Sequence, residues 1–313
     1  MTSRIGRCAL ASLLTVGTTA PALASSLLID GLNGPGSSTS ESVANNTTLW
    51  SLVMGATIST PAGDNMNPNQ ILRYYVVASG GGASSVFSMG EIDPALGGTN
   101  TAPYIALNGS SYSLIDPNSG ASGRDVSNLT SLQILAVPAL KNGPTVQSTT
   151  VQLSGLTNSP GPYDLAQLKA LPSATATEQF KSPPNDLYTG VPLWTFLNPS
   201  SLSNVTGEIV VAQATDGYQV VLSLAELDAA LGGNPNDLLA YMDGQTAFPG
   251  DGVARLVFPG DGTNHGRFNS NIDAIEVLNA TPLPSTWTMM LIGLAGLGFV
   301  AYRRHKPAAH AAA

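Results

Sequence analysis

The sequence predicts an α+β, mostly β protein: two tandem domains followed by a C-terminal transmembrane helix. Three observations support this fold class. Similar blocks recur in the same order over residues 26–140 and 146–280. Short segments alternate apolar and polar residues between Gly-rich turns. An uncharged apolar run covers residues 287–302. Charged residues make up only 10% of the 313, which is typical of an exported, loop-rich β protein.

The N-terminus has the features of a secretory leader. Arg4 and Arg7 form a positive region, an apolar stretch follows, and Ala22-Leu23-Ala24 gives a small-x-small cleavage site. We therefore expect residues 1–24 to be a signal peptide that signal peptidase removes. Cys8, the only cysteine, lies inside it, so the mature chain should have no disulfide, thiolate ligand or cysteine nucleophile.

The part of the chain between the leader and the tail is strongly acidic. It holds seven basic residues against 20 acidic ones, which gives a net charge of −13. Such a surface repels phosphate-rich partners, so we expect no nucleic-acid binding.

The duplication is carried by several separate blocks. Residues 88–93 (SMGEID) match 223–228 (SLAELD), and both continue to a Leu-Gly-Gly. Further matches join 123–129 to 266–272 and 49–51 to 193–195. We predict a first, degenerate repeat domain at 26–140 and a second domain at 146–280, with Lys141–Pro144 as the hinge.

The second copy is the clearer one. Asp216-Gly217 between two alternating segments predicts a hairpin, and Ser223 with Glu226 forms a capping box. The last strand should contain a bulge near Ala274. Strands are expected at 151–153, 208–214, 218–222, 238–242, 255–258 and 272–278. Helices are expected at 163–170 and 223–231, and the segment 190–197 should turn into a helix of one to two turns.

The order of these elements resembles the oxidoreductase molybdopterin-binding domain, the fold of sulfite oxidase-like proteins. The similar segments are 163–172, 188–194, 216–218, 224–227, 239–244, 255–259 and 266–267. The resemblance implies that fold for both copies, although the first lacks an equivalent of 163–172. In the enzymes of the family, a cysteine within the interval that corresponds to 173–187 ligates molybdenum, and here the interval contains none. We expect no cofactor and a protein that is not an enzyme. The alternative is a molybdopterin-dependent oxidoreductase-like protein with atypical, cysteine-free cofactor binding.

Other candidate site residues lie on loops and strands of the second copy. A ligand site is expected at Asp216, Tyr218, Arg255, His265 and Arg267. A pocket lined by Tyr218, Arg255 and His265 would favour ligand binding, and a filled one would favour a scaffold. Arg267 recurs as Arg124 in the first copy, and an arginine repeated in a duplicated fold favours a structural role over anion binding. A lone histidine makes no catalytic triad, and no loop has the spacing of a calcium site, so we expect no catalytic or metal-binding residues.

The tail resembles the PEP-CTERM sorting signal, with Leu where the family usually has Glu. The residues that carry the resemblance are Pro282, Leu283, Pro284, Ser285, Trp287, Arg303 and Arg304. The resemblance covers 282–306 and implies processing by an exosortase, a membrane transpeptidase. The apolar run 287–302 would form a transmembrane helix with its basic end in the cytoplasm. An ordinary C-terminal membrane anchor is the alternative.

Together these features predict an exported, non-catalytic protein. It would be anchored in the inner membrane facing the periplasm, and reach the cell envelope or the extracellular space after processing. We expect it to bind a ligand or a polysaccharide, or to be structural. Its expected partners are signal peptidase, an exosortase, the membrane through its C-terminal helix, and exopolysaccharide.

Overall fold

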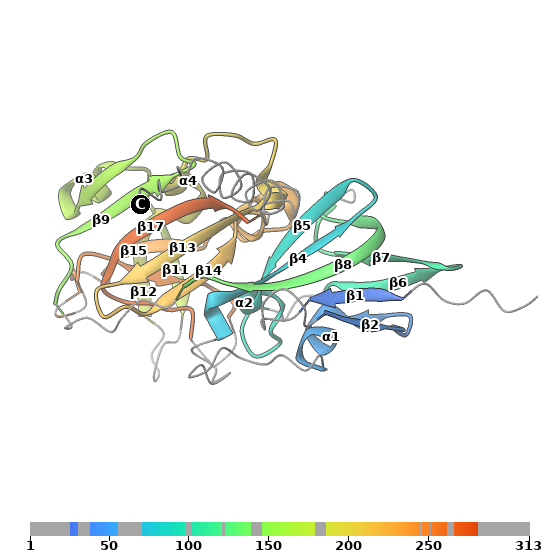
Figure 1. Cartoon of the computed structure of the whole chain (residues 1–313). Helices are drawn as coiled ribbons and strands as arrows, with labels where there is room; N and C mark the ends of the chain where they lie inside the picture. Colours follow the sequence, from blue (N-terminus) through green and yellow to red (C-terminus); the bar gives the residue numbers. More distant parts are fainter. Residues whose placement is uncertain are drawn as a thin grey trace, which may run out of the picture.

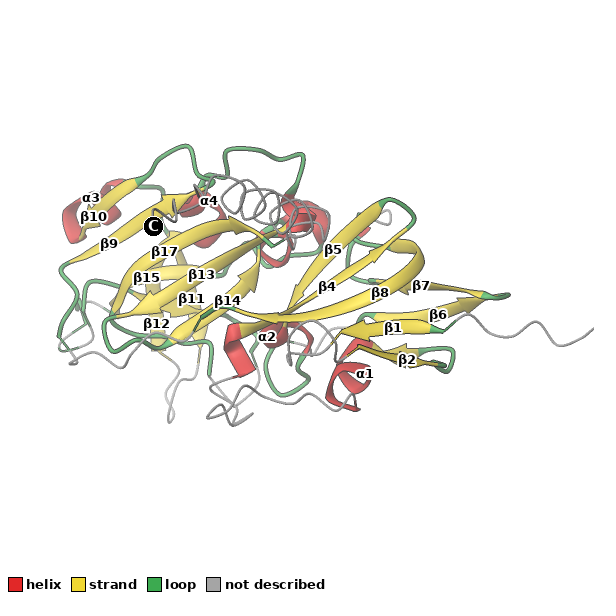
Figure 2. Ribbon diagram, viewed as in Figure 1, coloured by secondary structure: helices red, strands yellow, loops and turns green. Residues whose placement is uncertain are grey.

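The computed structural model describes residues 26–30, 38–55, 71–97, 102–120, 123–138, 146–178, 186–244, 246–248, 250, 252–261 and 266–280. Strands dominate these residues (Figure 2), and the longest helix described has seven residues. The α-helices are α1 (Leu49–Gly55), α2 (Met89–Ile92), α3 (Leu165–Ala170) and α4 (Leu193–Leu197). Single 3-10 turns lie at Ile71–Arg73, Val205–Gly207, Ala225–Leu227 and Ala229–Leu231.

The first half of the chain, between residues 26 and 138, forms one eight-stranded sheet. Its path runs β2-β1-β8-β7-β6-β3, and the hairpin of β4 and β5 joins it through β8. The strands are β1 (Leu27–Asp30), β2 (Ser38–Glu41), β3 (Thr47–Thr48), β4 (Tyr74–Gly80), β5 (Ala83–Ser88), β6 (Tyr104–Asn108), β7 (Ser111–Ile115) and β8 (Val126–Ala136).

The second half, residues 146–280, forms two sheets. One has the order β10-β9-β17-β13-β14 and the other β11-β12-β15-β16. The strands are β9 (Thr150–Gly155), β10 (Gly161–Asp164), β11 (Ala174–Glu178), β12 (Asp186–Pro192), β13 (Glu208–Ala214), β14 (Gln219–Ser223), β15 (Leu238–Asp243), β16 (Arg255–Val257) and β17 (Ile272–Asn279).

The two halves repeat one strand arrangement. The path β2-β1-β8-β4-β5 corresponds to β10-β9-β17-β13-β14, and in each the β1–β8 or β9–β17 pair is the only parallel one. Each half has a register shift at the same place, where Asn128 or Asn271 takes a positive φ of 50° or 59°. Asparagine tolerates this conformation better than most residues, which explains why Ser-Asn recurs in both copies.

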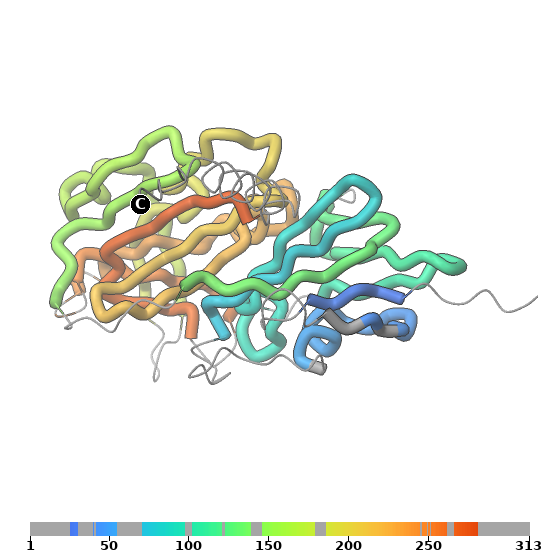
Figure 3. Tube along the Cα trace, viewed as in Figure 1, coloured from blue at the N-terminus to red at the C-terminus, as the bar shows by residue number. Residues whose placement is uncertain are grey.

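The halves lie side by side (Figures 1 and 3), with β5 of the first half against β14 of the second. A large buried apolar cluster extends through both of them. A smaller one joins the β4–β5 and β13–β14 hairpins through Val77, Val86, Ile209, Val211 and Val221. The two halves are therefore packed together by apolar contact as well as joined by the chain.

The predicted fold class is wrong as it stands. The described chain is mostly β with a few short helices, and none of these helices is long and apolar enough to cross a membrane. The transmembrane helix expected at 287–302 is therefore not supported, and its residues lie outside the described ones, as does the leader at 1–24.

Individual elements of the second half differ from expectation in instructive ways. The predicted hairpin is β13 and β14, and the bulge leaves Asp273 between the paired Ile272 and Ala274. The helix expected at 223–231 is instead two 3-10 turns, because the extended backbone of Asp228 ends the first turn and its side chain caps the second. Strands β11 and β12 lie between residues 174 and 192, where no strand is expected.

Candidate functional site

Two capping boxes, one in each half, meet at the boundary between the halves. At the start of α2, the Glu91 amide donates to Ser88 Oγ (3.0 Å) and the Ser88 amide donates to Glu91 Oε2 (3.3 Å). In the second half, the Glu226 amide donates to Ser223 Oγ (3.1 Å) and the Ser223 amide to Glu226 Oε1 (2.9 Å). The sequence alone predicts the second box, and the internal repeat extends it to the first.

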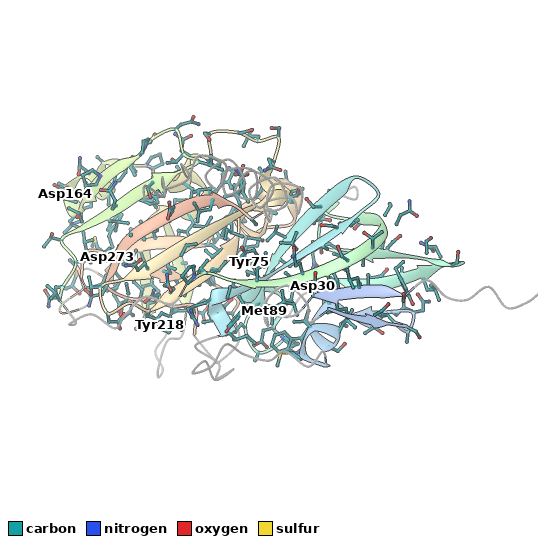
Figure 4. All side chains as sticks on the ribbon, viewed as in Figure 1. Asp30, Tyr75, Met89, Asp164, Tyr218 and Asp273 are labelled. Carbon is teal, nitrogen blue, oxygen red and sulfur yellow. The ribbon has the colours of Figure 1, made fainter. Side chains whose placement is uncertain are left out.

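Each serine hydroxyl also crosses to the other half. Ser88 Oγ donates to Glu226 Oε1 (3.0 Å), and Ser223 Oγ donates to Glu91 Oε2 (2.9 Å). The four residues therefore form a reciprocal set in which each capping serine binds the glutamate of the opposite half. Figure 4 labels Met89, the residue of α2 that follows Ser88, near the meeting of the halves.

Two buried arginines complete what we call the inter-repeat cluster: Ser88, Glu91, Arg124, Ser223, Glu226 and Arg267. Arg124 pairs with Glu91, and its Nη2 donates to Val86 O (2.6 Å) and Ser223 Oγ (3.2 Å). Arg267 donates from Nη1 to Glu226 Oε2 (2.8 Å) and from Nε to Asp261 Oδ2 (2.9 Å). Both arginines are buried, so their guanidinium groups make these charge-assisted hydrogen bonds in place of bonds to water.

Each arginine also stacks on a phenylalanine. The guanidinium carbon of Arg124 is 4.1 Å from the ring centre of Phe87, and that of Arg267 is 4.3 Å from Phe258. These distances are within the range of cation–π attraction. Each ring therefore adds an attractive contact to the hydrogen bonds that its guanidinium makes.

Burial and neighbouring charges shift the pKa values of acids in the inter-repeat cluster and next to it. Burial, and then the charge of Glu91, raises the pKa of Glu226 from its ordinary 4.5 to about 7, although Arg267 opposes the rise. Burial also raises the pKa of Asp116 and, much further, that of Asp237. Burial alone would lower the pKa of Arg267, but Asp261, Glu226 and Asp237 outweigh it and raise that pKa. The site can therefore hold a proton near neutral pH.

A cavity of about 240 Å³ lies beside the cluster. Five carboxylates line it: Glu91, Asp116, Glu226, Asp237 and Asp261. The cations on the described part of its wall are Arg124 and Arg267. Among the residues that the structure describes, no three His, Cys, Asp or Glu side chains are placed to hold a metal ion.

The chemistry of this wall does not fit an anionic pterin cofactor. Both arginines on it are already paired with carboxylates, and the acids outnumber them. An anionic ligand would therefore meet net repulsion in a site of low dielectric.

The structure separates the residues expected to bind a ligand. Arg267 lies in the inter-repeat cluster, whereas Asp216 accepts a bond from the Tyr218 amide (2.9 Å) within its own turn. The Tyr218 hydroxyl donates to Gly266 O (2.7 Å), and Arg255 lies over Phe248 at 5.2 Å. Neither Tyr218 nor Arg255 lines the cavity. His265 lies outside the described residues, as do the sorting-signal residues Pro282, Leu283, Pro284, Ser285, Trp287, Arg303 and Arg304.

Sequence reasoning missed Glu91 and Glu226 as partners of the repeated arginines. In the sequence, Glu226 is explained by its own capping box, Glu91 is only its counterpart in the repeat, and the arginines are interpreted separately. The available signal was co-occurrence: both halves repeat a Ser-x-x-Glu block and, further on, a Gly-Arg block. Two blocks that are duplicated together are candidates for direct contact.

Comparison with known proteins identifies the tail. Residues 280–304 match the family model of the PEP-CTERM protein-sorting motif. This motif marks an exported protein that an exosortase processes and sorts to the cell envelope. No curated protein matches the sequence.

Among solved structures, the chain is similar to the sulfane dehydrogenase SoxCD from Paracoccus pantotrophus. The sequences are 15% identical, the TM-score is 0.34, and the match covers 56% of this chain. The chain spans about half (49%) of the length of that structure. A likeness at this level carries no argument about activity, and the sulfite oxidase-like identity of the two halves is not established by it.

Proposed function

We propose that this exported chain is a non-catalytic protein of the cell envelope or extracellular matrix, where its folded part acts as a structural or polymer-binding module. The observation that carries the proposal is the sorting motif at 280–304. The motif sorts the chain to the cell envelope, where secreted polymers accumulate, so we propose an exopolysaccharide as its partner.

The contacts within the inter-repeat cluster support a non-catalytic role. Glu91 and Glu226 each accept bonds from a serine and an arginine, and each arginine also lies against a phenylalanine ring. A general acid or base must reach a substrate proton. Here Glu226, Arg124 and Arg267, whose pKa values are raised, bind other members of the cluster, which is the pattern of a structural ion-pair network.

The residues expected to form a ligand pocket also have structural roles. Tyr218 ties its hairpin to the loop at Gly266, and Asp216 holds the turn between β13 and β14. These contacts favour a scaffold over a pocket at this end of the second half.

Fractionation with metal analysis tests the proposal. A tagged full chain should appear in the envelope or matrix fraction of wild-type cells, and in a different fraction when the exosortase is absent. The purified protein should contain no molybdenum. Stoichiometric molybdenum, or an unchanged distribution without exosortase, would contradict the proposal.

A further inference from the structure

A surface hollow in the second half is lined by uncharged polar and apolar residues. It is bordered by α4, by the loop that follows α4, and by Asn158 in the loop after β9. Its volume of about 610 Å³ lies within the range of roughly 300–1,000 Å³ that is common for ligand sites. The cavity beside the inter-repeat cluster, at 240 Å³, lies below that range. Figure 1 shows α4 on the second half, away from the strands of the first.

Among the residues that the structure describes, no charged side chain lines the hollow. Around the backbone at Pro199 it presents the hydrogen-bonding side chains of Asn158, Thr195, Asn198 and Ser200, and the apolar surfaces of Trp194 and Leu202. Leu202 is 72% exposed, the most exposed large hydrophobic residue among those described. Trp194 is half-buried: part of its side chain packs on the core and part faces the hollow. An apolar face flanked by neutral polar groups is therefore open to solvent.

The rim of the hollow is held in place by its own hydrogen bonds. Asn158 Nδ2 donates to Pro199 O (2.9 Å), and Asn198 Nδ2 donates to Ser159 Oγ (2.9 Å). Asn198 ends α4 in a left-handed conformation (φ 42°), and its amide donates to Trp194 O (3.1 Å). Since the lining is already ordered, a ligand would bind without a large cost of fixing loops.

We propose that this hollow, the Trp194 hollow, binds a sugar residue of a neutral polysaccharide. A pyranose ring has one face of C–H groups and a periphery of hydroxyls. The C–H face matches the electron-rich face of an indole, and the hydroxyls match amide and hydroxyl side chains that both donate and accept. The proposal deepens the proposed function and rests on it for the presence of such polymers around the protein.

Charge selects the neutral class of glycan. An acidic polysaccharide would find no cation in the hollow and a folded chain of net charge −13 around it. A cationic ligand would find no carboxylate among the lining side chains. The hollow combines a concave shape, one aromatic side chain and uncharged hydrogen-bonding groups. A neutral sugar can bind through all three.

Affinity electrophoresis of the full exported chain tests the proposal. The probes are the neutral polysaccharides dextran, galactomannan and xyloglucan, with alginate as the acidic comparison. We expect at least one neutral polymer to retard the chain while alginate does not. Trp194→Ala should weaken the retardation about tenfold, since loss of an aromatic contact costs up to about 1.5 kcal/mol.

Two matched variants control for folding. Trp50→Ala removes the tryptophan at the equivalent helix position of the first half, which is also half-buried against the core but does not line the hollow. Leu202→Asp adds a charge at an exposed position of the hollow, whereas Val146→Asp does so at a residue that is 59% exposed elsewhere. Retardation should be lost with Leu202→Asp and kept with Trp50→Ala and Val146→Asp.

Retardation by no neutral polymer, or equal loss in Trp50→Ala and Trp194→Ala, would overturn the proposal. So would stronger retardation by alginate than by every neutral polymer. These outcomes are separate from the fractionation test, because a chain without a glycan site could still be sorted to the envelope.

Discussion

Glutamine at position 226 removes a titrating group from the centre of the inter-repeat cluster. The pKa of Glu226 is about 7 in the folded chain, against an ordinary value of 4.5, and burial is the main cause. The folded state therefore binds the proton more tightly than the unfolded state does. It follows that this contribution to stability is fully present below about pH 4.5 and is lost as the pH rises through 7.

The size of the effect can be worked out from those two values. At about 1.4 kcal/mol per pH unit, the difference corresponds to at most about 3 kcal/mol in the free energy of unfolding. In a chain of this length, 1 kcal/mol shifts the melting temperature by about 2–4 °C. We therefore expect wild type to melt lower at pH 8 than at pH 5, by no more than about 6–12 °C. The raised pKa values of Asp116 and Asp237 act in the same direction.

Thermal unfolding at several pH values between 5 and 8 measures the slope of the melting temperature against pH. Glu226→Gln should flatten it, since the amide keeps the shape of the protonated acid and cannot ionise. Glu276→Gln, at an exposed position on β17, should leave the slope unchanged. If Glu226→Gln retains the full wild-type slope, the raised pKa does not belong to Glu226 and the titration that we assign to it is wrong.

Three further predictions concern single residues. Arg267→Met leaves two buried acids without their cation and should lower the free energy of unfolding, measured by chemical denaturation, by about 3–5 kcal/mol. Arg267→Lys should recover part of this loss. A loss below about 1 kcal/mol would contradict the prediction. Gly232→Ala should destabilise more than Gly244→Ala in the same assay. Both have positive φ, but a Cβ at Gly232 would lie 2.1 Å from the carbonyl oxygen of Asn118 in the other half, whereas nothing lies within 4 Å of one at Gly244. Leu283→Glu restores the residue usual in the sorting motif and should increase the released fraction on cell fractionation; equal release would mean that position 283 does not limit processing.

Local sequence signals predicted the parts of the fold that depend on neighbours in the chain. The Asp216-Gly217 pair predicted the β13–β14 hairpin because the turn requires a residue that tolerates a positive φ, and Gly217 has φ 88°. Strand β12 was missed because its Thr189-Gly190 step looks like a turn. In the folded chain Gly190 lies so close to Leu239 O on β15 that a Cβ would be 2.4 Å from it. That requirement comes from a strand about fifty residues away, so no local pattern reveals it.

The candidate site was harder to predict for the same reason. Ser223 and Glu91 are 132 positions apart, and each already has a local partner that explains its presence. The duplication was visible in the sequence, but how the two copies face each other was not. Only the docked halves show that a capping serine of one copy reaches the glutamate of the other.

The reciprocal contacts point to a role in positioning the halves. The smaller apolar cluster between the hairpins consists of aliphatic residues, and apolar contact has no preferred direction. Buried ion pairs are weak evidence for stability, and the Arg124–Glu91 and Arg267–Glu226 pairs each lie within one half. Sliding one half would instead break both crossed serine–glutamate bonds and the bond from Arg124 to Ser223 at once. The two serines should therefore be coupled. In a double-mutant cycle, Ser88→Ala and Ser223→Ala should each destabilise, and the double variant should depart from additivity by about 0.5–3 kcal/mol in denaturant unfolding. Strict additivity would mean that the two crossed bonds act independently and do not set the docking of the halves.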